Sequence, residues 1–279
     1  VQGLLSLGLG LVFAAAGARA AQNPKAPSND DCLACHSDPE GKRENGSSIA
    51  VLPEPFGKSV HGPMSCVDCH VDLATTVDFP HREKLKKVDC ASCHEDIPKE
   101  LRRSVHARVT AGPDGPDCVS CHGPAHLILP RSDPGSMVAK VNLATTCGSC
   151  HSNADFLARH KIPFARPVDA YRLSVHGRAV ARGSLEAASC SDCHGSHAVI
   201  PSRDAAGKTN HWKVPETCGS CHKEVAKIYA DSVHGQAVAR GVLGSPVCTD
   251  CHGEHTLLAP SEPNSLVNPA RVSTVTCGR

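Results

Sequence analysis

Large side chains are scarce in this sequence. Only 3% of the 279 residues are aromatic, with five Phe, two Tyr and one Trp, whereas Gly and Pro number 23 and 21. A chain with so few bulky side chains has little with which to fill an ordinary hydrophobic core. Because it also carries 17 Cys and 18 His, we expect something other than side chains to supply much of its buried apolar mass.

A strong net charge is also lacking. The formal net charge is +1 at pH 7, with 29 basic and 28 acidic residues. Such a balance gives no strong attraction to nucleic acid or to anionic lipid. We therefore expect no nucleic-acid partner.

The N-terminus has the pattern of an export signal. An apolar run from Gly3 to Gly17 precedes Ala18-Arg19-Ala20, which is typical of a signal-peptidase site, although the usual positive segment before the run is missing. The run is shorter than the about 20 residues of a transmembrane helix. We predict that residues 1–20 are a signal peptide, incomplete at its N-terminus, with an uncleaved anchor as the alternative.

The sequence Cys-x-x-Cys-His occurs eight times and uses 16 of the 17 cysteines. The cysteine pairs are Cys32 and Cys35, Cys66 and Cys69, Cys90 and Cys93, Cys118 and Cys121, Cys147 and Cys150, Cys190 and Cys193, Cys218 and Cys221, and Cys248 and Cys251. The histidines that follow them are His36, His70, His94, His122, His151, His194, His222 and His252. The remaining Cys277 stands in Thr-Cys-Gly, as do Cys147 and Cys218, and is expected to open a ninth motif that is cut short.

These motifs have the pattern of covalent haem attachment. The two thiols can bond to the vinyl groups of one porphyrin while the adjacent histidine binds its iron from the same side. Zinc and thiol redox sites also use Cys-x-x-Cys pairs, but they do not require the His that follows all eight pairs. A disulfide framework explains neither that His nor the odd cysteine. We predict eight haem c sites and a truncated ninth, with the porphyrins forming the packed interior.

The motifs, numbered one to eight along the chain, alternate between two types. Odd motifs resemble Thr-Cys-Gly-Ser-Cys-His, and three even motifs are followed closely by a second histidine, His126, His197 or His255. A Ser-Val-His element, ending at His61, His106, His176 or His234, separates the odd from the even motif. This periodicity predicts one multihaem domain over 21–279, made of two-haem repeats. The predicted repeats are about 28–84, 85–140, 141–212 and 213–271, with a fifth begun at 272–279.

Ten histidines outside the motifs are candidates for the second axial position of the irons. Met64 and Met137 are the only methionines, so Met ligation cannot be general, and bis-His ligation with low reduction potentials is expected. The predicted distal ligands are His61, His81, His106, His126, His176, His197, His234 and His255. His160 and His211 fall outside the repeat pattern, and their role stays open between spare residue, propionate partner and ligand of the ninth haem.

Sequence distance suggests which iron each distal histidine serves. A histidine three or four residues after a motif His leaves from the same side of that haem and cannot cross its plane. The histidines after even motifs should therefore serve another haem. The Ser-Val-His residues lie 12 or 25 residues after the odd-motif histidines, which allows a loop over the haem, and we assign them to the preceding odd motif. His81 is expected to replace the post-motif histidine that the first repeat lacks.

Ordered structure between the motifs is expected to be sparse. Short helices are predicted at 155–160, 172–182, 225–233 and 236–240, and Pro-, Gly- or Asn-rich loops at 112–117 and 261–269. No alternating strand pattern of useful length is present. The predicted fold class is mostly irregular with short α-helices and little or no β-structure, as in a haem-packed multihaem cytochrome c.

The Ser-Val-His-Gly element followed by Cys-x-Asp-Cys-His-Gly-x-His resembles the doubled-motif multihaem cytochromes c of respiring bacteria, over nearly all of 30–279. The resemblance implies a periplasmic or outer-surface carrier that relays electrons from a quinol-linked or periplasmic donor to a terminal reductase or extracellular acceptor. Partners would be redox proteins or a membrane quinol-oxidising module. Membrane association through a further C-terminal segment or an uncleaved N-terminus stays open.

The same resemblance includes enzymes, which gives the alternative function: a multihaem oxidoreductase acting on nitrite, hydroxylamine or tetrathionate. Nitrite reductases typically carry a Cys-x-x-Cys-Lys motif, which this sequence lacks. Hydroxylamine oxidoreductases need a tyrosine to crosslink their active haem, and only Tyr171 and Tyr229 are available. More candidate ligands than irons favour a carrier over an enzyme, because a catalytic iron needs an open position. A structural filament of stacked cytochromes shares all these features.

Overall fold

The computed structural model describes residues 26–109, 115–162 and 166–278. These ranges form short helices joined by irregular segments, and they contain no strand apart from one isolated β-bridge between Lys42 and Ser48. The predicted fold class is thereby confirmed. The predicted signal peptide, residues 1–20, lies outside the described residues. Across the ranges given above, no helix has the length and apolar character needed to cross a membrane.

The α-helices are short, and most have fewer than eight residues. They are α1 (Asn29–His36), α2 (Pro53–Lys58), α3 (Cys66–Cys69), α4 (Ile97–Arg103), α5 (Val105–Val109), α6 (Cys118–His122), α7 (Leu143–His151), α8 (Ala154–Arg159), α9 (Pro167–Leu173), α10 (Val175–Ala181), α11 (Cys190–His194), α12 (Val214–Gly219), α13 (Lys223–Asp231), α14 (Val233–Ala239) and α15 (Cys248–His252). Single 3-10 turns are η1 (Val71–Leu73), η2 (Cys90–Ser92), η3 (Ala125–Leu127) and η4 (Lys140–Asn142), and η5 (Val272–Thr276) is one π-helical turn.

The helices predicted from the sequence are present, but two of them are broken at a serine. The segment predicted as helical at 172–182 is broken at Ser174, between α9 and α10, and the one at 225–233 is broken at Ser232, between α13 and α14. Ser174 has an extended backbone (ψ 163°), and its Oγ accepts a hydrogen bond from the N–H of Gly177. A serine in this conformation satisfies one of the free N–H groups of the next helix, so it ends one helix and begins another.

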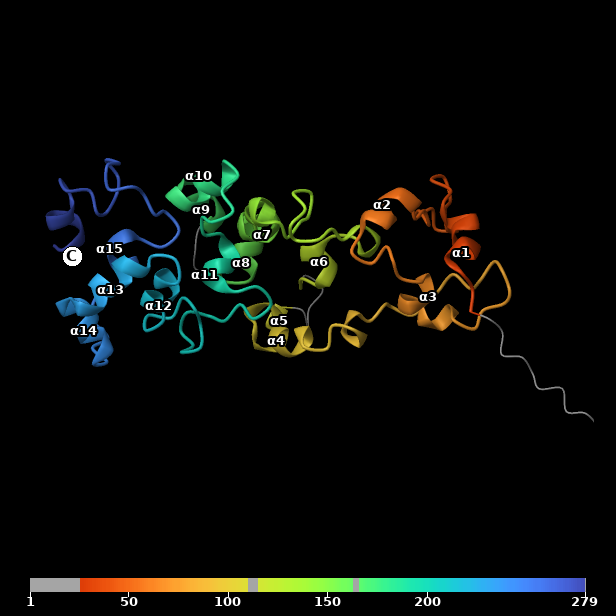
Figure 1. Cartoon of the computed structure of the whole chain (residues 1–279), viewed down its shortest axis with the longest axis horizontal. Helices are drawn as coiled ribbons and strands as arrows, with labels where there is room; N and C mark the ends of the chain where they lie inside the picture. The colour runs from red at the N-terminus through yellow and green to blue at the C-terminus, as the bar shows by residue number, and fades with distance from the viewer. Residues whose placement is uncertain (1–25, 110–114, 163–165, 279) are drawn as a thin grey trace, which may run out of the picture.

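The molecule is elongated, and the chain runs from one end to the other (Figure 1). Helices α1 to α3 lie at one end, α4 to α8 and α11 in the middle, and α13 and α14 at the opposite end beside the C-terminus (Figure 1). Helix α2 packs on η3, which follows the fourth motif. The predicted repeats therefore follow one another along the long axis and make contact with their neighbours.

The protein part has almost no hydrophobic core of its own. The buried apolar residues in the described ranges are Ala139, Leu157, Val168, Val180, Val214 and Val247. The accessible surface is 19500 Å² for a 29.2 kDa chain, whereas a compact monomer of this mass exposes about 11,500 Å². Polypeptide alone therefore does not form a compact globule here, in line with the shortage of large side chains.

Candidate haem sites

Even motifs begin α3, α6, α11 and α15, and each helix is capped by its own sequence. The Asp before the second Cys accepts a hydrogen bond from the backbone N–H of the residue before the first Cys, at 2.8 Å for Asp68 and 2.7 Å for Asp192 and Asp250. In the fourth motif the roles reverse, and Asp117 accepts from the N–H of Ser120. These contacts satisfy N–H groups that a helix start leaves free. The Asp of Cys-x-Asp-Cys-His thus fixes the turn that carries both thiols.

Three odd motifs, the third, fifth and seventh, are held by a different contact. The Ser before the second Cys donates to the carbonyl of the residue before the first Cys, from Ser92 to Asp89 (2.7 Å), Ser149 to Thr146 (2.8 Å) and Ser220 to Thr217 (2.8 Å). The side chain thereby bridges the turn from end to end. Both motif types present two thiols and an imidazole from one short turn.

The cysteines of neighbouring motifs lie beside one another. None of the seventeen takes part in a disulfide. Within a repeat, the first Cys of the odd motif contacts the first Cys of the even motif. The pairs are Cys32 with Cys66, Cys90 with Cys118, Cys147 with Cys190, and Cys218 with Cys248. Burial, with Cys32 adjacent, raises the pKa of Cys66 to about 11, whereas the hydrogen bond from Cys218 lowers that of Cys248 to about 7.

Between repeats, the second cysteines are neighbours instead. The neighbouring pairs are Cys69 with Cys93, Cys121 with Cys150, and Cys193 with Cys221. The two kinds of contact alternate along the chain. They join all eight motifs into one unbroken series that follows the order of the sequence.

Seven motif histidines each face a second imidazole. The ring-centre distances are 6.0 Å for His36 and His81, 6.1 Å for His70 and His126, 6.3 Å for His94 and His61, 6.1 Å for His122 and His197, 6.3 Å for His151 and His106, 5.9 Å for His194 and His255, and 6.0 Å for His222 and His176. The narrow spread, over seven pairs from different parts of the chain, indicates one shared arrangement.

This spacing fits a metal between the two rings. Imidazole nitrogens bind transition metals at about 2 Å, as they do in zinc sites, and a ring atom lies roughly 1.1 Å from the ring centre when its bonds are about 1.33 Å long. Two rings on opposite sides of one iron therefore have centres about 6.3 Å apart. The seven measured distances, 5.9 to 6.3 Å, match that value. The residues present thus fit a six-coordinate haem iron.

The Ser-Val-His residues do not face the motif to which we assigned them. His61, His106 and His176 lie against His94, His151 and His222, the odd motifs of the following repeat. The assignment to the preceding odd motif is therefore wrong. Sequence distance measures only how far the chain can reach, and it does not show the direction in which a histidine is presented.

The post-motif histidines face backward. His126, His197 and His255 lie against His70, His122 and His194, the even motifs of the preceding repeat. The second and third repeats thus each give one histidine forward and one backward. His81 does not behave as a post-motif histidine, because its ring faces that of His36 in its own repeat. It holds the position that a Ser-Val-His histidine of an earlier repeat would have, which corrects the role predicted from the sequence.

A backbone hydrogen bond joins the same two elements at each junction. The N–H of the Val in Ser-Val-His donates to the carbonyl two residues after the post-motif histidine of the next repeat. The bonds run from Val60 to Ile128, Val105 to Val199 and Val175 to Leu257, each 2.8 Å long. At the third junction, the guanidinium of Arg178 also forms a bidentate ion pair with the carboxylate of Glu262, with N–O distances of 2.6 and 3.1 Å. We call this set of contacts the clasp.

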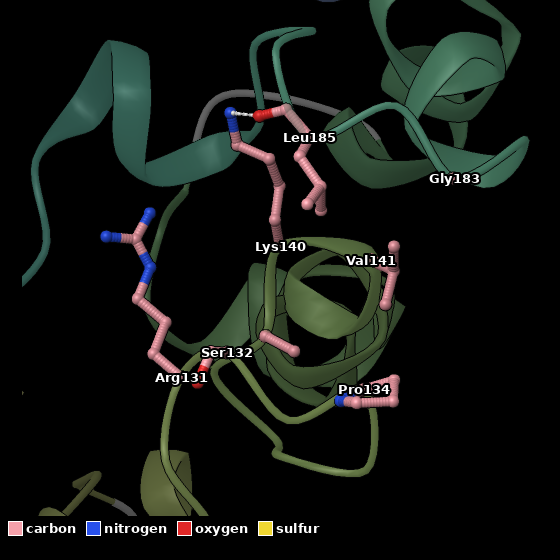
Figure 2. A pocket seen from close by; sticks show the side chains of 8 residues that line it. Arg131, Ser132, Pro134, Lys140, Val141, Gly183 and Leu185 are labelled. Carbon is pink, nitrogen blue, oxygen red and sulfur yellow. Dashed lines mark hydrogen bonds between the residues drawn. The ribbon is translucent and has the colours of Figure 1, made fainter.

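A cavity also lies between the second and third repeats. It measures about 790 Å³ and is lined by Arg131, Ser132, Pro134, Ala139, Lys140, Val141, Gly183 and Leu185. Lys140 reaches across it and donates to the carbonyl of Leu185 at 2.8 Å (Figure 2). Its Nζ also lies 3.2 Å from Asp192, the capping residue of the sixth motif. Lys140 thus ties the second repeat to a motif of the third.

A glycine turns the chain back after three even motifs. Gly123, Gly195 and Gly253 follow the motif histidine with φ of 87°, 84° and 82° and ψ near 180°. Only glycine adopts this conformation readily. The second motif has Val71 at this position, and there the chain continues into η1. The glycine thus accounts for the close spacing of motif and post-motif histidines.

Burial lowers the pKa of several of the paired imidazoles and so favours their neutral form. It lowers the pKa of His194 to about 4, aided by the neighbouring His255 and His151. Burial is also the leading cause of the lowered pKa of His106 and His176. The neutral imidazole is the form that binds metals. Nδ1 of His36 contacts the carbonyl of Ile49 at 2.7 Å, which leaves Nε2 for a metal.

Four other histidines have no facing motif imidazole among the described residues. His160 packs on Phe156 (4.3 Å) and His211 on Trp212 (4.9 Å), and Nε2 of each is buried without a hydrogen-bond partner. His234, predicted as a distal ligand, and His252, an even-motif histidine, are both exposed. The role of His160 and His211 therefore stays open.

The two tyrosines that the enzymatic alternative would draw on are engaged with the backbone. The hydroxyls of Tyr171 and Tyr229 donate to the carbonyls of Ala188 and Pro246 at 2.9 Å. Both acceptors lie two residues before an even motif, so each tyrosine links its helix to that motif.

Comparison with known proteins bears on the same segments. The family model described as cytochrome c7 and related cytochrome c matches residues 77–152, which hold the third, fourth and fifth motifs. This match supports a multihaem c-type cytochrome. Such a cytochrome binds haem c covalently and transfers electrons through it. No curated protein and no solved structure matches the chain.

Proposed function

We propose that this cytochrome conducts electrons along a series of bis-His haems c that follow the order of its eight motifs. It would relay them between a quinol-linked or periplasmic donor and a terminal reductase or extracellular acceptor. The unbroken series of neighbouring motifs is the observation that carries the proposal. An electron entering at any site has another site beside it, so the chain needs no long transfer step.

Bound haem supplies one-electron chemistry at its iron. The protein residues position and tune that chemistry. Two cysteines would fix each macrocycle to a short turn, and at the seven paired sites two imidazoles would hold the iron in both oxidation states. Little then moves when an electron arrives. In six of the seven pairs the two histidines come from different repeats, so the clasp that joins repeats also sets the distance between neighbouring sites.

Protein contacts differ from site to site and are expected to spread the reduction potentials. The carboxylate of Glu100 lies 3.5 Å from Nδ1 of His197, whereas Nδ1 of His36 and His81 contact backbone carbonyls. A charged acceptor strengthens an imidazole donor more than a carbonyl does. The fourth site is therefore expected to have a lower potential than the first.

Mass and magnetic resonance together test the proposal. The matured chain should exceed the polypeptide mass by eight haems, and the oxidised protein should show predominantly low-spin, bis-His ferric signals. A mass without haem would overturn the proposal. High-spin haem at a site other than that of His252 would instead favour the enzymatic alternative, in which an open iron acts on a small nitrogen or sulfur compound.

Location is tested separately. The protein is expressed in cells with its own N-terminal segment, and the cells are fractionated. If the predicted signal peptide directs export, haem-stained protein should be found in the periplasmic fraction. Haem-free protein in the cytoplasmic fraction would contradict the periplasmic assignment.

A further inference from the structure

The clasp forms three times in the chain, and its fourth copy is open. The N–H of Val233 has no acceptor in the described part of the chain, in contrast to Val60, Val105 and Val175. Val233 is 78% exposed, against 45% for Val60. The fourth Ser-Val-His element thus presents a donor that elsewhere binds the next repeat.

The residues around Val233 are uncovered in the same way. Ser174 is fully buried in the third clasp, whereas Ser232 is only half-buried. His176 is half-buried against His222, but His234 is exposed. Both elements have the same local structure, because Ser232 caps α14 as Ser174 caps α10. The difference therefore lies in what covers them.

The eighth motif is open on the matching side. His70, His122 and His194 are half-buried, each against a post-motif histidine of the following repeat. His252 is exposed, and no imidazole of the described residues faces it in that way. One end of the molecule thus has both parts of an incomplete junction. Among the described residues, His234 is a candidate distal ligand with no motif to serve, and His252 is a motif histidine with no distal partner.

The Thr before Cys277 makes the same kind of hydrogen bond as the Thr before the first Cys of two earlier odd motifs. Thr146 and Thr217, each just before an odd-motif Cys, donate from Oγ1 to the carbonyls of Met137 (2.6 Å) and Lys208 (2.7 Å). Thr276 donates to Leu266 at 2.5 Å. Cys277 is therefore placed like the first cysteine of an odd motif.

The opposite end of the molecule cannot complete this junction. There His81 already stacks on His36, which closes the first odd site. The second motif is followed by Val71 and η1 in place of a glycine and a nearby histidine. A second copy approaching by its N-terminal end would offer neither an unfilled odd motif nor a post-motif histidine. The occupant must bring both.

We propose that the end formed by α13, α14 and α15 binds a further two-haem repeat that begins at Cys277. That repeat would take His234 as the distal ligand of its odd-motif haem and would supply a post-motif histidine to the haem at His252. The carbonyl two residues after that histidine would accept from Val233. The inference rests on the proposed bis-His haem chain and adds a polarity to it, because His36 already has a facing imidazole whereas His234 and His252 are exposed.

The 279-residue chain tests this directly, with His176→Ala as the matched control for His234→Ala. In the matured chain, about one haem in eight should lack bis-His signals, and free imidazole should convert it to low spin. His234→Ala should leave the spectrum unchanged, whereas His176→Ala should double the high-spin fraction. Entirely low-spin haem, in a monomer or a dimer, would overturn the inference, as would a new high-spin signal in His234→Ala. Absence of haem from the mass would reject the proposed function instead.

A longer chain tests the occupant. In it, Cys277 is followed by a copy of residues 148–212, which supplies an odd motif, an even motif and a post-motif histidine. In this chain His234→Ala should now produce one additional high-spin haem, and the haem at His252 should no longer respond to imidazole. An unchanged spectrum for His234→Ala in the longer chain would show that a following repeat does not use His234.

Discussion

The imidazole of His106 lies 6.3 Å from that of His151, although the two residues are 45 positions apart and belong to different predicted repeats. Next to His106, the N–H of Val105 donates to the carbonyl of Val199. This bond also joins the second repeat to the third and so supports the contact between the two histidines. A haem site shared in this way is complete only when two repeats have folded together. Nearest-neighbour coupling of this kind is expected to make the chain cooperative, as in other repeat proteins.

Replacement of His106 by Ala should open one haem without removing it. The thioether bonds from Cys147 and Cys150 hold the macrocycle, so the intact mass should fall only by the side-chain difference. One haem in the oxidised protein should become high-spin, as measured by electron paramagnetic resonance. His160→Ala serves as the control, because His160 faces Phe156. The same loss of low-spin signal in both variants would contradict the pairing of His106 with His151.

The haem motifs were visible in the sequence because all their parts are local. Two cysteines, a histidine and a capping Asp or Ser fall within one turn, and the structure gives Asp192 and Ser149 the contacts described above. The broken helix at Ser174 is equally local, since it depends on one side-chain cap. Spacing and residue type suffice for such features.

The pairing of distal histidines was not visible, because it depends on contacts between repeats. His61 is 25 residues from His36 and 33 from His94, and the chain can span either distance. The backbone N–H of Val60 donates to the carbonyl of Ile128, and this bond holds His61 near the following repeat. Because a backbone hydrogen bond does not depend on residue type, the sequence does not reveal it. The role of His81 was missed for a related reason. As the first repeat has no predecessor among the described residues, its odd site is closed by a loop that the other repeats lack.

Glu100→Gln should raise the reduction potential of the haem that binds His122 and His197. The carboxylate near Nδ1 makes His197 a stronger donor, which stabilises ferric iron. Because Glu100 is half-exposed, the contact contributes at most about 1 kcal/mol, equivalent to about 40 mV for one electron. Spectroelectrochemical titration measures this shift. Glu54→Gln, which removes a carboxylate paired only with Lys58, should leave the potentials as they are; an equal shift there would assign the effect to net charge.

The third clasp should weaken in acid. The hydrogen bond from Arg178 holds the pKa of the Glu262 carboxyl below its usual value of 4.5, with further help from the N–H of Ala259. A carboxyl with a lowered folded-state pKa stabilises the fold above its unfolded pKa and ceases to do so as pH falls through the folded value. Thermal unfolding should therefore show wild type above Glu262→Gln at pH 7 and the two converging below about pH 4. A constant difference across that range would show that the lost charge is not responsible.

Gly195→Ala should damage the fourth site from a distance. Gly195 has φ 84° and ψ 177°, a conformation that costs other residues about 1–3 kcal/mol, and an added Cβ would lie 3.0 Å from the carbonyl of Ala198. Relief of this strain moves His197, two residues on, away from His122. We expect a lower unfolding temperature together with one high-spin haem. Gly57→Ala is the matched control, since its Cβ meets nothing within 4 Å and alanine is the better helix former by about 1 kcal/mol. A destabilised Gly195→Ala protein that keeps all its low-spin signal would show that the glycine serves the fold alone and does not position His197.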